Sequence, residues 1–80
     1  MIPPRIKEVN ALDDFSIEIT YSTNEKKIYD MRKLLEYNCY KNLKNVAYFK
    51  QVKSAETTVE WPNGEDIDPN ELYTNSIYIN

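Results

Sequence analysis

Oxygen-bearing side chains gather near the carboxyl-terminal end of the sequence, where they could bind a cation. Asp66 and Asp68 are two residues apart, so on a strand both would lie on the same face. Three further oxygen donors lie close to this pair in sequence: Asn63, Glu65 and Glu71. Such oxygens suit hard cations, although the spacing matches no known calcium loop. We expect no resident metal or cofactor and keep a cation or small-ligand site at turn 63–68 as an alternative.

Other residue types that carry catalysis are scarce. The sequence has no histidine, which excludes serine and cysteine triads that use histidine as the base. Its single glycine excludes the glycine-rich loops that cradle phosphates. The single cysteine, Cys39, cannot build a zinc cluster, so we expect it to be a small, partly buried side chain. The chain is not expected to be an enzyme.

Charge is distributed unevenly along the sequence. All ten Lys and Arg residues lie within residues 1–53, whose net charge is +3. Residues 54–80 carry six acids and no base. This asymmetry either creates opposed surface potentials or averages out where the two parts intermix in space. The basic residues form no continuous stripe, so nucleic-acid binding is less favoured than protein binding.

The elements that must position these side chains begin with three strands. Residues 5–12 can form the first strand, and Asp13-Asp14 favours a turn after it. Residues 15–21 alternate apolar and polar side chains, as a half-buried strand does, and residues 26–29 can form a third strand. The second strand would direct four side chains into the core: Phe15, Ile17, Ile19 and Tyr21. The sequence therefore predicts an antiparallel meander.

Short helices and further strands are expected after the meander. Asp30 can cap a helix over residues 31–37, and Asn45 can cap another that ends at residue 49. Residues 51–54 and 57–61 are typical of two more strands, the second of which places Trp61 in the core.

The carboxyl-terminal part favours a turn, one helical turn and a final extended segment. Pro62-Asn63-Gly64 ends the preceding strand. Asp68-Pro69-Asn70-Glu71 has the pattern of a capping box and opens a helical turn through Tyr73. Residues 74–80 form either an edge strand or a frayed tail. The sequence thus predicts a single α+β domain over residues 1–80, with a small antiparallel sheet and short helices.

The composition favours a cytoplasmic protein. One cysteine cannot form an intramolecular disulfide, on which small secreted domains usually depend. Residues 1–5 lack the pattern of a signal peptide, and no apolar window reaches the length of a membrane span. We therefore expect no membrane association.

One part of the sequence carries a family pattern: the Trp61-Pro62-Asn63-Gly64 turn, followed by Asp66, Ile67, Pro69, Leu72 and Tyr73. Weaker matches lie at residues 6–9, 15–17, 28–30, 34–35 and 49–52. Through them nearly the whole chain resembles the small bacterial proteins grouped as domain of unknown function 2442. It departs from them at Asn24-Glu25, where relatives often have a glycine turn.

The resemblance implies an α+β domain that is often encoded beside another small protein, an arrangement suggestive of toxin–antitoxin behaviour. Some relatives add a helix-turn-helix domain, and we expect this chain to be a single-domain member without it. We expect a non-catalytic protein-interaction or accessory module, with an antitoxin-like role in a two-gene unit as one form.

Two kinds of partner fit that expectation. One is a small protein encoded nearby, and the other is a second copy, paired through the edge of residues 77–79. The expected interaction surface is made of five residues: Asn63, Glu65, Asp66, Glu71 and Tyr73.

Overall fold

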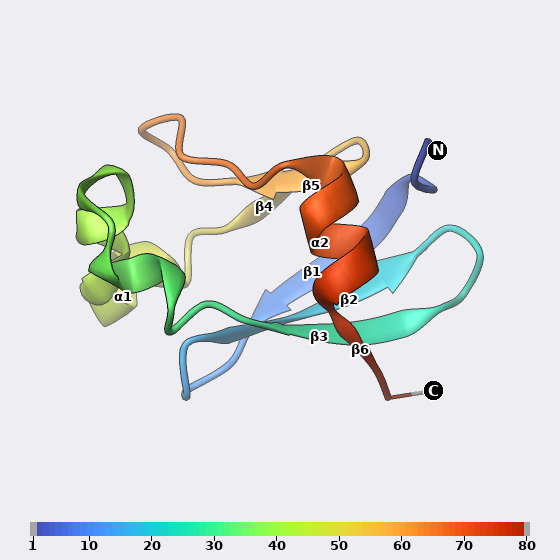
Figure 1. Ribbon diagram of the computed structural model, residues 1–80, viewed down its shortest axis with the longest axis horizontal. Coiled ribbons are helices and arrows are strands. Elements are labelled where there is room, and N and C mark those ends of the chain that lie inside the picture. The colour runs from blue at the N-terminus through green and yellow to red at the C-terminus, as the bar shows by residue number, and fades with distance from the viewer. Residues whose placement is uncertain (1, 80) are drawn as a thin grey trace.

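The computed structural model describes residues 2–79, which form an α+β domain built on an antiparallel meander (Figure 1). Its strands are β1 (Ile6–Ala11), β2 (Ser16–Tyr21) and β3 (Lys26–Asp30). A short strand near the carboxyl terminus, β6 (Ile77–Tyr78), pairs antiparallel with β3, so the strand order is β1-β2-β3-β6. The predicted meander is confirmed, and the last segment forms an edge strand.

Both turns of the meander contain a non-glycine residue with left-handed backbone. Phe15 has a φ of 62°, and its ring packs edge-on against Phe49, with the ring centroids 5.3 Å apart. Asn24, at the position where a glycine turn was expected from the resemblance, has a φ of 72°. Asparagine tolerates this conformation better than most residues, so the second hairpin forms without glycine.

The helix predicted over residues 31–37 forms only as a 3₁₀ turn over residues 34–36. Met31, directly after β3, is still bonded to the first hairpin, because its N–H donates to the carbonyl of Phe15 at 3.0 Å. Two 3₁₀ turns follow, η1 (Leu34–Glu36) and η2 (Asn38–Lys44), separated by the extended backbone of Tyr37. Asp30 is not the N-cap of η1, because that turn starts at Leu34 with Lys33 at its N-cap. The Asp30 carboxylate accepts from the backbone N–H and the guanidinium of Arg32.

The middle of the chain forms a short helix and a second hairpin. In α1 (Val46–Phe49), the Asn45 side chain accepts from Tyr48 N–H, so the predicted cap is confirmed. The hairpin consists of β4 (Lys53–Ala55) and β5 (Thr58–Glu60), both shorter than predicted. Strand β4 starts late because residues 49–52 still turn, with Gln51 N–H bonded to the carbonyl of Tyr48.

Helix α2 (Pro69–Asn75) closes the core over the sheet, as Figure 1 shows. Asp68 caps it by accepting from Glu71 N–H at 3.0 Å, so the predicted cap is confirmed. The other half of the capping box is not formed in the described residues, because the Glu71 carboxylate accepts from Tyr29 and Asn75 instead. The cap fixes where the helix starts, and the buried Leu72 fixes which face it turns inward. No helix within residues 2–79 is long and apolar enough to cross a bilayer.

The core lies between the inner face of the sheet and the elements that cover it. Ile17, Ile19 and Tyr21 of β2 are fully buried, as the alternation of the sequence predicts, whereas Phe15 is only partly buried. Trp61 is 1 % exposed, and its indole N–H donates to the carbonyl of Phe49 at 2.9 Å. Trp61 thus ties the end of β5 to α1.

Candidate interaction groove

A groove of 640 Å³ opens beside α2, where β3 ends and the chain turns into η1. Its walls come from four segments: the end of β3 (Ile28, Tyr29, Asp30), the η1 region (Lys33, Leu34, Tyr37), helix α2 (Glu71, Asn75) and the β6 segment (Ile77, Ile79). The groove exists because β6 pairs with only two residues of β3, Lys27 and Ile28, which leaves the last part of β3 uncovered.

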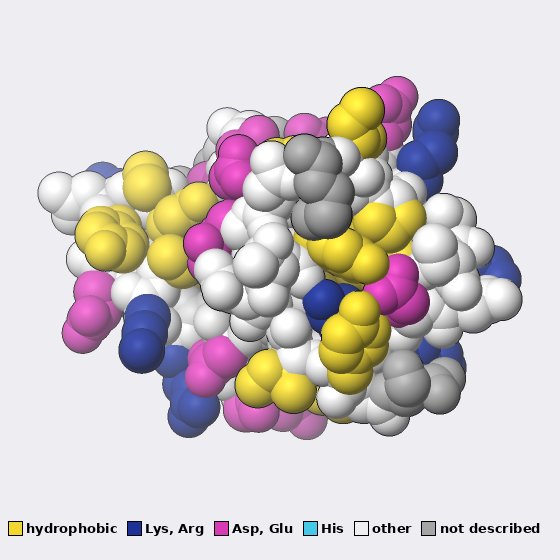
Figure 2. All heavy atoms as spheres, turned by 45° about the vertical axis from the view of Figure 1, so that its right-hand side comes forward, with side chains coloured by type: hydrophobic (Ala, Val, Ile, Leu, Met, Phe, Trp, Pro, Cys, Tyr) yellow, Lys and Arg dark blue, Asp and Glu magenta, His cyan; other side chains and the backbone are white. Residues whose placement is uncertain are grey.

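Several of the apolar side chains that line the groove are exposed to solvent. Ile77 is 72 % exposed, Tyr37 61 % and Ile79 47 %. In Figure 2, hydrophobic side chains on the face shown reach the surface in separate groups, with acidic and basic side chains between them. Covering the apolar residues of the groove would be favourable by roughly 25 cal/mol per Å² of apolar surface removed from water.

The polar side of the groove is set by Glu71. Tyr29 O–H donates to one of its carboxylate oxygens at 2.8 Å, and the Asn75 amide donates to the other at 2.7 Å. Burial, together with the hydrogen bond to Glu71, raises the pKa of Tyr29, so this phenol stays protonated as a donor. Glu71 is therefore held in one orientation, with its negative charge at the groove.

A second carboxylate lies at the same groove. Asp30 forms a bidentate contact with the Arg32 guanidinium, whose shortest distance is 2.7 Å. Hydrogen bonds from the Arg32 side chain and backbone lower the pKa of Asp30, which keeps it ionised at neutral pH. The lining contains two acids and one base, Lys33, and Asp30 is already paired with Arg32. Among the described residues, Glu71 is therefore the carboxylate of the groove that has no cationic partner.

A cluster around Lys27 fixes the far side of α2 and β6. Lys27 is only 3 % exposed, and its ammonium donates to the carbonyl of Tyr73. The ammonium lies 4.2 Å from the ring centroid of Tyr73 and 4.4 Å from that of Tyr78. Both phenols donate to Glu25, at 2.8 Å and 2.6 Å. Cation–π contacts of this kind stabilise the positive charge of a lysine that has little access to water. The cluster ties α2 and β6 to the hairpin between β2 and β3.

Glu25 makes the attachment of this cluster sensitive to acid. Hydrogen bonds from Thr23, Tyr78 and Tyr73 lower the pKa of its carboxyl. The ionised Glu25 carboxylate therefore stabilises the folded domain. This contribution is complete above the pKa of an unfolded glutamate, about 4.3, and is lost as the pH falls through the lower pKa of Glu25 in the folded state.

We expect Glu25→Gln to destabilise the domain at neutral pH, because its neutral amide replaces a carboxylate that accepts three hydroxyl groups. Urea unfolding at pH 7 to 3 should show this difference from the original chain shrinking below about pH 4.3. Glu36→Gln, at an exposed glutamate of η1, is the control. A difference that stays constant down to pH 3 would contradict the role of the carboxylate.

The acidic turn lies at a second, smaller hollow of 320 Å³, lined by Cys39, Tyr40, Asn63, Gly64, Glu65 and Asp66. Tyr48 O–H donates to Glu65 at 2.6 Å and accepts from Asn63 N–H, while Tyr40 O–H donates to the carbonyl of Asp66. Burial opposes ionisation of Glu65, but the hydrogen bonds from Tyr48, its own N–H and Asn42 outweigh it and lower its pKa. These contacts give the turn a structural role.

Two expectations about this turn are wrong. Asp66 and Asp68 do not share a strand face, because Asp66 makes a single bridge to Glu60 and Asp68 caps α2. Cys39 is exposed instead of partly buried, since η2 carries it on its outer side. Among residues 2–79, no three metal-binding side chains gather as a cation site would need.

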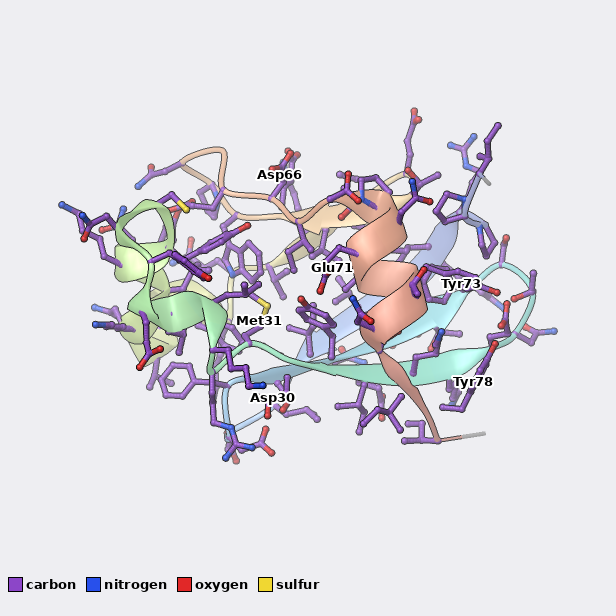
Figure 3. All side chains as sticks on the ribbon, in the orientation of Figure 1. Asp30, Met31, Asp66, Glu71, Tyr73 and Tyr78 are labelled. Atoms are coloured by element: carbon purple, nitrogen blue, oxygen red, sulfur yellow. The ribbon has the colours of Figure 1, made fainter. Side chains whose placement is uncertain are left out.

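The five residues of the expected interaction surface lie at three places. Asn63, Glu65 and Asp66 stay together at the smaller hollow. Figure 3 shows Glu71 and Tyr73 leaving α2 on different sides, Glu71 at the groove and Tyr73 at the hairpin cluster. Only Glu71 lines the larger groove.

The interaction surface predicted from the sequence did not include Tyr37, Ile77 and Ile79, which provide the exposed apolar surface of the groove. Residues 77–79 were selected only as an edge through which two copies pair. Their signal was weak: Ile77 and Ile79 stand in a short polar context after the last helix, and Tyr37 was assigned to a helix that forms only as a turn ending before it.

A protein-family model described as "Protein of unknown function (DUF2442)" matches residues 6–78. No curated protein and no solved structure matches the chain. The match covers every strand and helix of the structure, including the walls of the groove up to Ile77.

Proposed function

The chain belongs to the DUF2442 family, and we propose that it is a non-catalytic module that binds another protein through the groove between β3, η1, α2 and β6. The observation that carries this proposal is the 640 Å³ groove with exposed apolar walls and an ordered acidic side. A fixed polar group beside an apolar hollow is typical of sites that recognise one orientation of a ligand.

The chemistry of the groove indicates what the partner presents. Tyr37, Leu34 and Ile77 suit an apolar side chain, and the carboxylate of Glu71 suits a basic side chain beside it. Opposite charges at the rim would orient the partner and speed its association. The proposed partner is a small protein with an exposed apolar anchor next to Lys or Arg, encoded beside this chain, towards which the module acts as an antitoxin-like or accessory protein.

The ionisation of the carboxylates supports a binding role over an acid–base role. A general acid or base works best with a pKa near the working pH, which for a carboxyl requires a raised pKa. At the groove, hydrogen bonds from Arg32 lower the pKa of Asp30, and at the two other sites hydrogen bonds lower the pKa of Glu25 and of Glu65. These groups act as permanent acceptors. We place the module in the cytoplasm, where the exposed thiol of Cys39 stays reduced.

The test is to co-express the chain with the product of the adjacent gene of its host and measure the affinity of the purified pair by calorimetry. Tyr37→Asp puts a charge into the apolar wall and should weaken binding at least about tenfold, which corresponds to about 1.4 kcal/mol. Val46→Asp introduces the same charge at an exposed apolar residue of α1 outside the groove and should leave binding unchanged.

Two results would count against the proposal. One is the absence of a complex between the two purified proteins. The other is an equal loss of affinity from Tyr37→Asp and Val46→Asp, because the groove would then have no special part in binding.

A further inference from the structure

We propose that two copies of this chain pair through the outer edge of β6, antiparallel and centred on Tyr78, and so continue the sheet across a twofold axis. This contact does not depend on the partner proposed for the groove. It follows from the edge of the sheet, from the backbone groups that β6 leaves free and from the order of its side chains.

The two edges of the four-stranded sheet differ in how they are protected. At β1 the pairing is interrupted by a bulge between Ile6 and Glu8, and Ile6 N–H donates to the carbonyl of Glu56 in the second hairpin. Bulges, charges and covering loops are the usual means of blocking an edge. The segment of β6 and Ile79 has no charge, proline or bulge, and its three side chains are about half exposed or more.

The backbone of β6 offers a self-complementary pair of hydrogen bonds. Ile79 N–H donates to the carbonyl of Lys26 at 2.9 Å, so residues 77 and 79 direct their backbone groups towards β3. Because these directions alternate along a strand, the N–H and carbonyl of Tyr78 face outward. Two copies related by a twofold axis at Tyr78 can exchange both bonds.

The side chains of this segment read the same in both directions, Ile77-Tyr78-Ile79. In an antiparallel pair centred on Tyr78, Ile77 of one copy lies opposite Ile79 of the other, and the two Tyr78 rings face each other. Apolar and aromatic cross-strand pairs each contribute roughly 0.2–1 kcal/mol. A second copy therefore matches this edge at every position, which a strand of unrelated sequence does only by chance.

The seam, meaning the contact between residues 77–79 of the two copies, is short, and this limits the expected affinity of the dimer. Stable interfaces bury about 800 Å² on each partner, which three residues cannot supply. The dimer should therefore depend on concentration. Since Ile77 and Ile79 also line the groove, pairing of two copies would shield part of that wall and compete with a partner bound there.

Two double variants test the register directly in sedimentation experiments from about 10 µM to about 1 mM chain. Ile77→Lys with Ile79→Lys places like charges opposite each other at both ends of the seam and should weaken dimerisation at least about tenfold. Ile77→Glu with Ile79→Lys introduces as many charges, but the antiparallel register now sets glutamate opposite lysine, so this variant should dimerise more strongly than the first.

Circular dichroism checks that both variants keep the fold, and Tyr37→Asp in the groove should leave self-association unchanged. A monomer of the original chain over the whole concentration range would overturn the inference while leaving the groove proposal standing. Equal self-association of the two double variants would overturn the register.

Discussion

Replacing Trp61 with alanine is expected to lower the free energy of unfolding by about 3–5 kcal/mol, as is usual for a buried aromatic side chain. Trp61 is 1 % exposed, stacks in a tilted arrangement on Phe49 at 5.9 Å between ring centroids, and donates its N–H to the Phe49 carbonyl. A domain of this size has roughly 4–12 kcal/mol of total stability. The expected loss is therefore between about a quarter and all of that stability.

Urea unfolding followed by far-ultraviolet circular dichroism measures this loss, because the variant lacks the only tryptophan and has no tryptophan fluorescence. Trp61→Phe is the matched control. It keeps an aromatic ring in the core but removes the shorter of the two hydrogen bonds to the Phe49 carbonyl and leaves only that from Val52 N–H, at 3.4 Å, so about 1–3 kcal/mol should be lost. A loss below 1 kcal/mol for Trp61→Ala would show that the end of β5 is not packed as described.

Replacing Leu72 with alanine should have the next largest effect, a loss of about 2–5 kcal/mol. Leu72 is the buried side chain through which α2 contacts the core, and the helix has only seven residues. Helices this short have little stability of their own and depend on packing. Because α2 also carries Glu71 and leads into β6, the groove should open before the rest of the sheet unfolds.

Native-state hydrogen exchange distinguishes a local from a global effect of Leu72→Ala. Relative to the original chain, the variant should exchange the amides of α2 and β6 faster, and by a larger factor than the amides of β2, which lies at the centre of the meander. Thr74→Ala, at an exposed residue of the same helix, should change stability by no more than about 0.5 kcal/mol. Uniform acceleration across α2 and β2 would contradict the expected order of opening.

The strands of the meander and the caps could be predicted from sequence because both are local. Alternation over residues 15–21 identifies the buried face of β2, and the side chains of Asn45 and Asp68 bond to N–H groups three residues later. Features that depend on residues so close in sequence form in almost any tertiary context. The bounds of the observed strands differ from the predicted bounds by one or two residues, since the adjoining turns decide where each strand ends.

The error at residues 31–37 has a tertiary cause. Asp30 followed by Met31, Leu34 and Leu35 has the local pattern of a capped helix. In the structure Met31 N–H bonds to the Phe15 carbonyl and a single turn follows, in which Leu34 and Leu35 N–H bond to the Met31 carbonyl. The turn stops at Tyr37, whose backbone is extended. Phe15 lies sixteen residues before Met31, and its left-handed backbone is set by the first hairpin, which no local pattern reveals.

The groove could not be predicted because it depends on a long-range pairing. It forms where α2 ends and β6 returns to β3, which brings residues 77–79 beside residues 26–28 and leaves the end of β3 uncovered. The acidic residues near the end of the sequence drew attention first, yet Glu65 and Glu71 accept from Tyr48 and Tyr29 and Asp68 caps α2. Much of that negative charge therefore also serves the fold.

The most direct test of the proposed function is amide exchange of this chain with and without the product of the adjacent gene. Binding in the groove predicts slower exchange in residues 28–37 and 71–79, which form its walls, and little change in β1 or in turn 63–66. Protection confined to turn 63–66 or to β1, with the walls of the groove unchanged, would contradict the proposal.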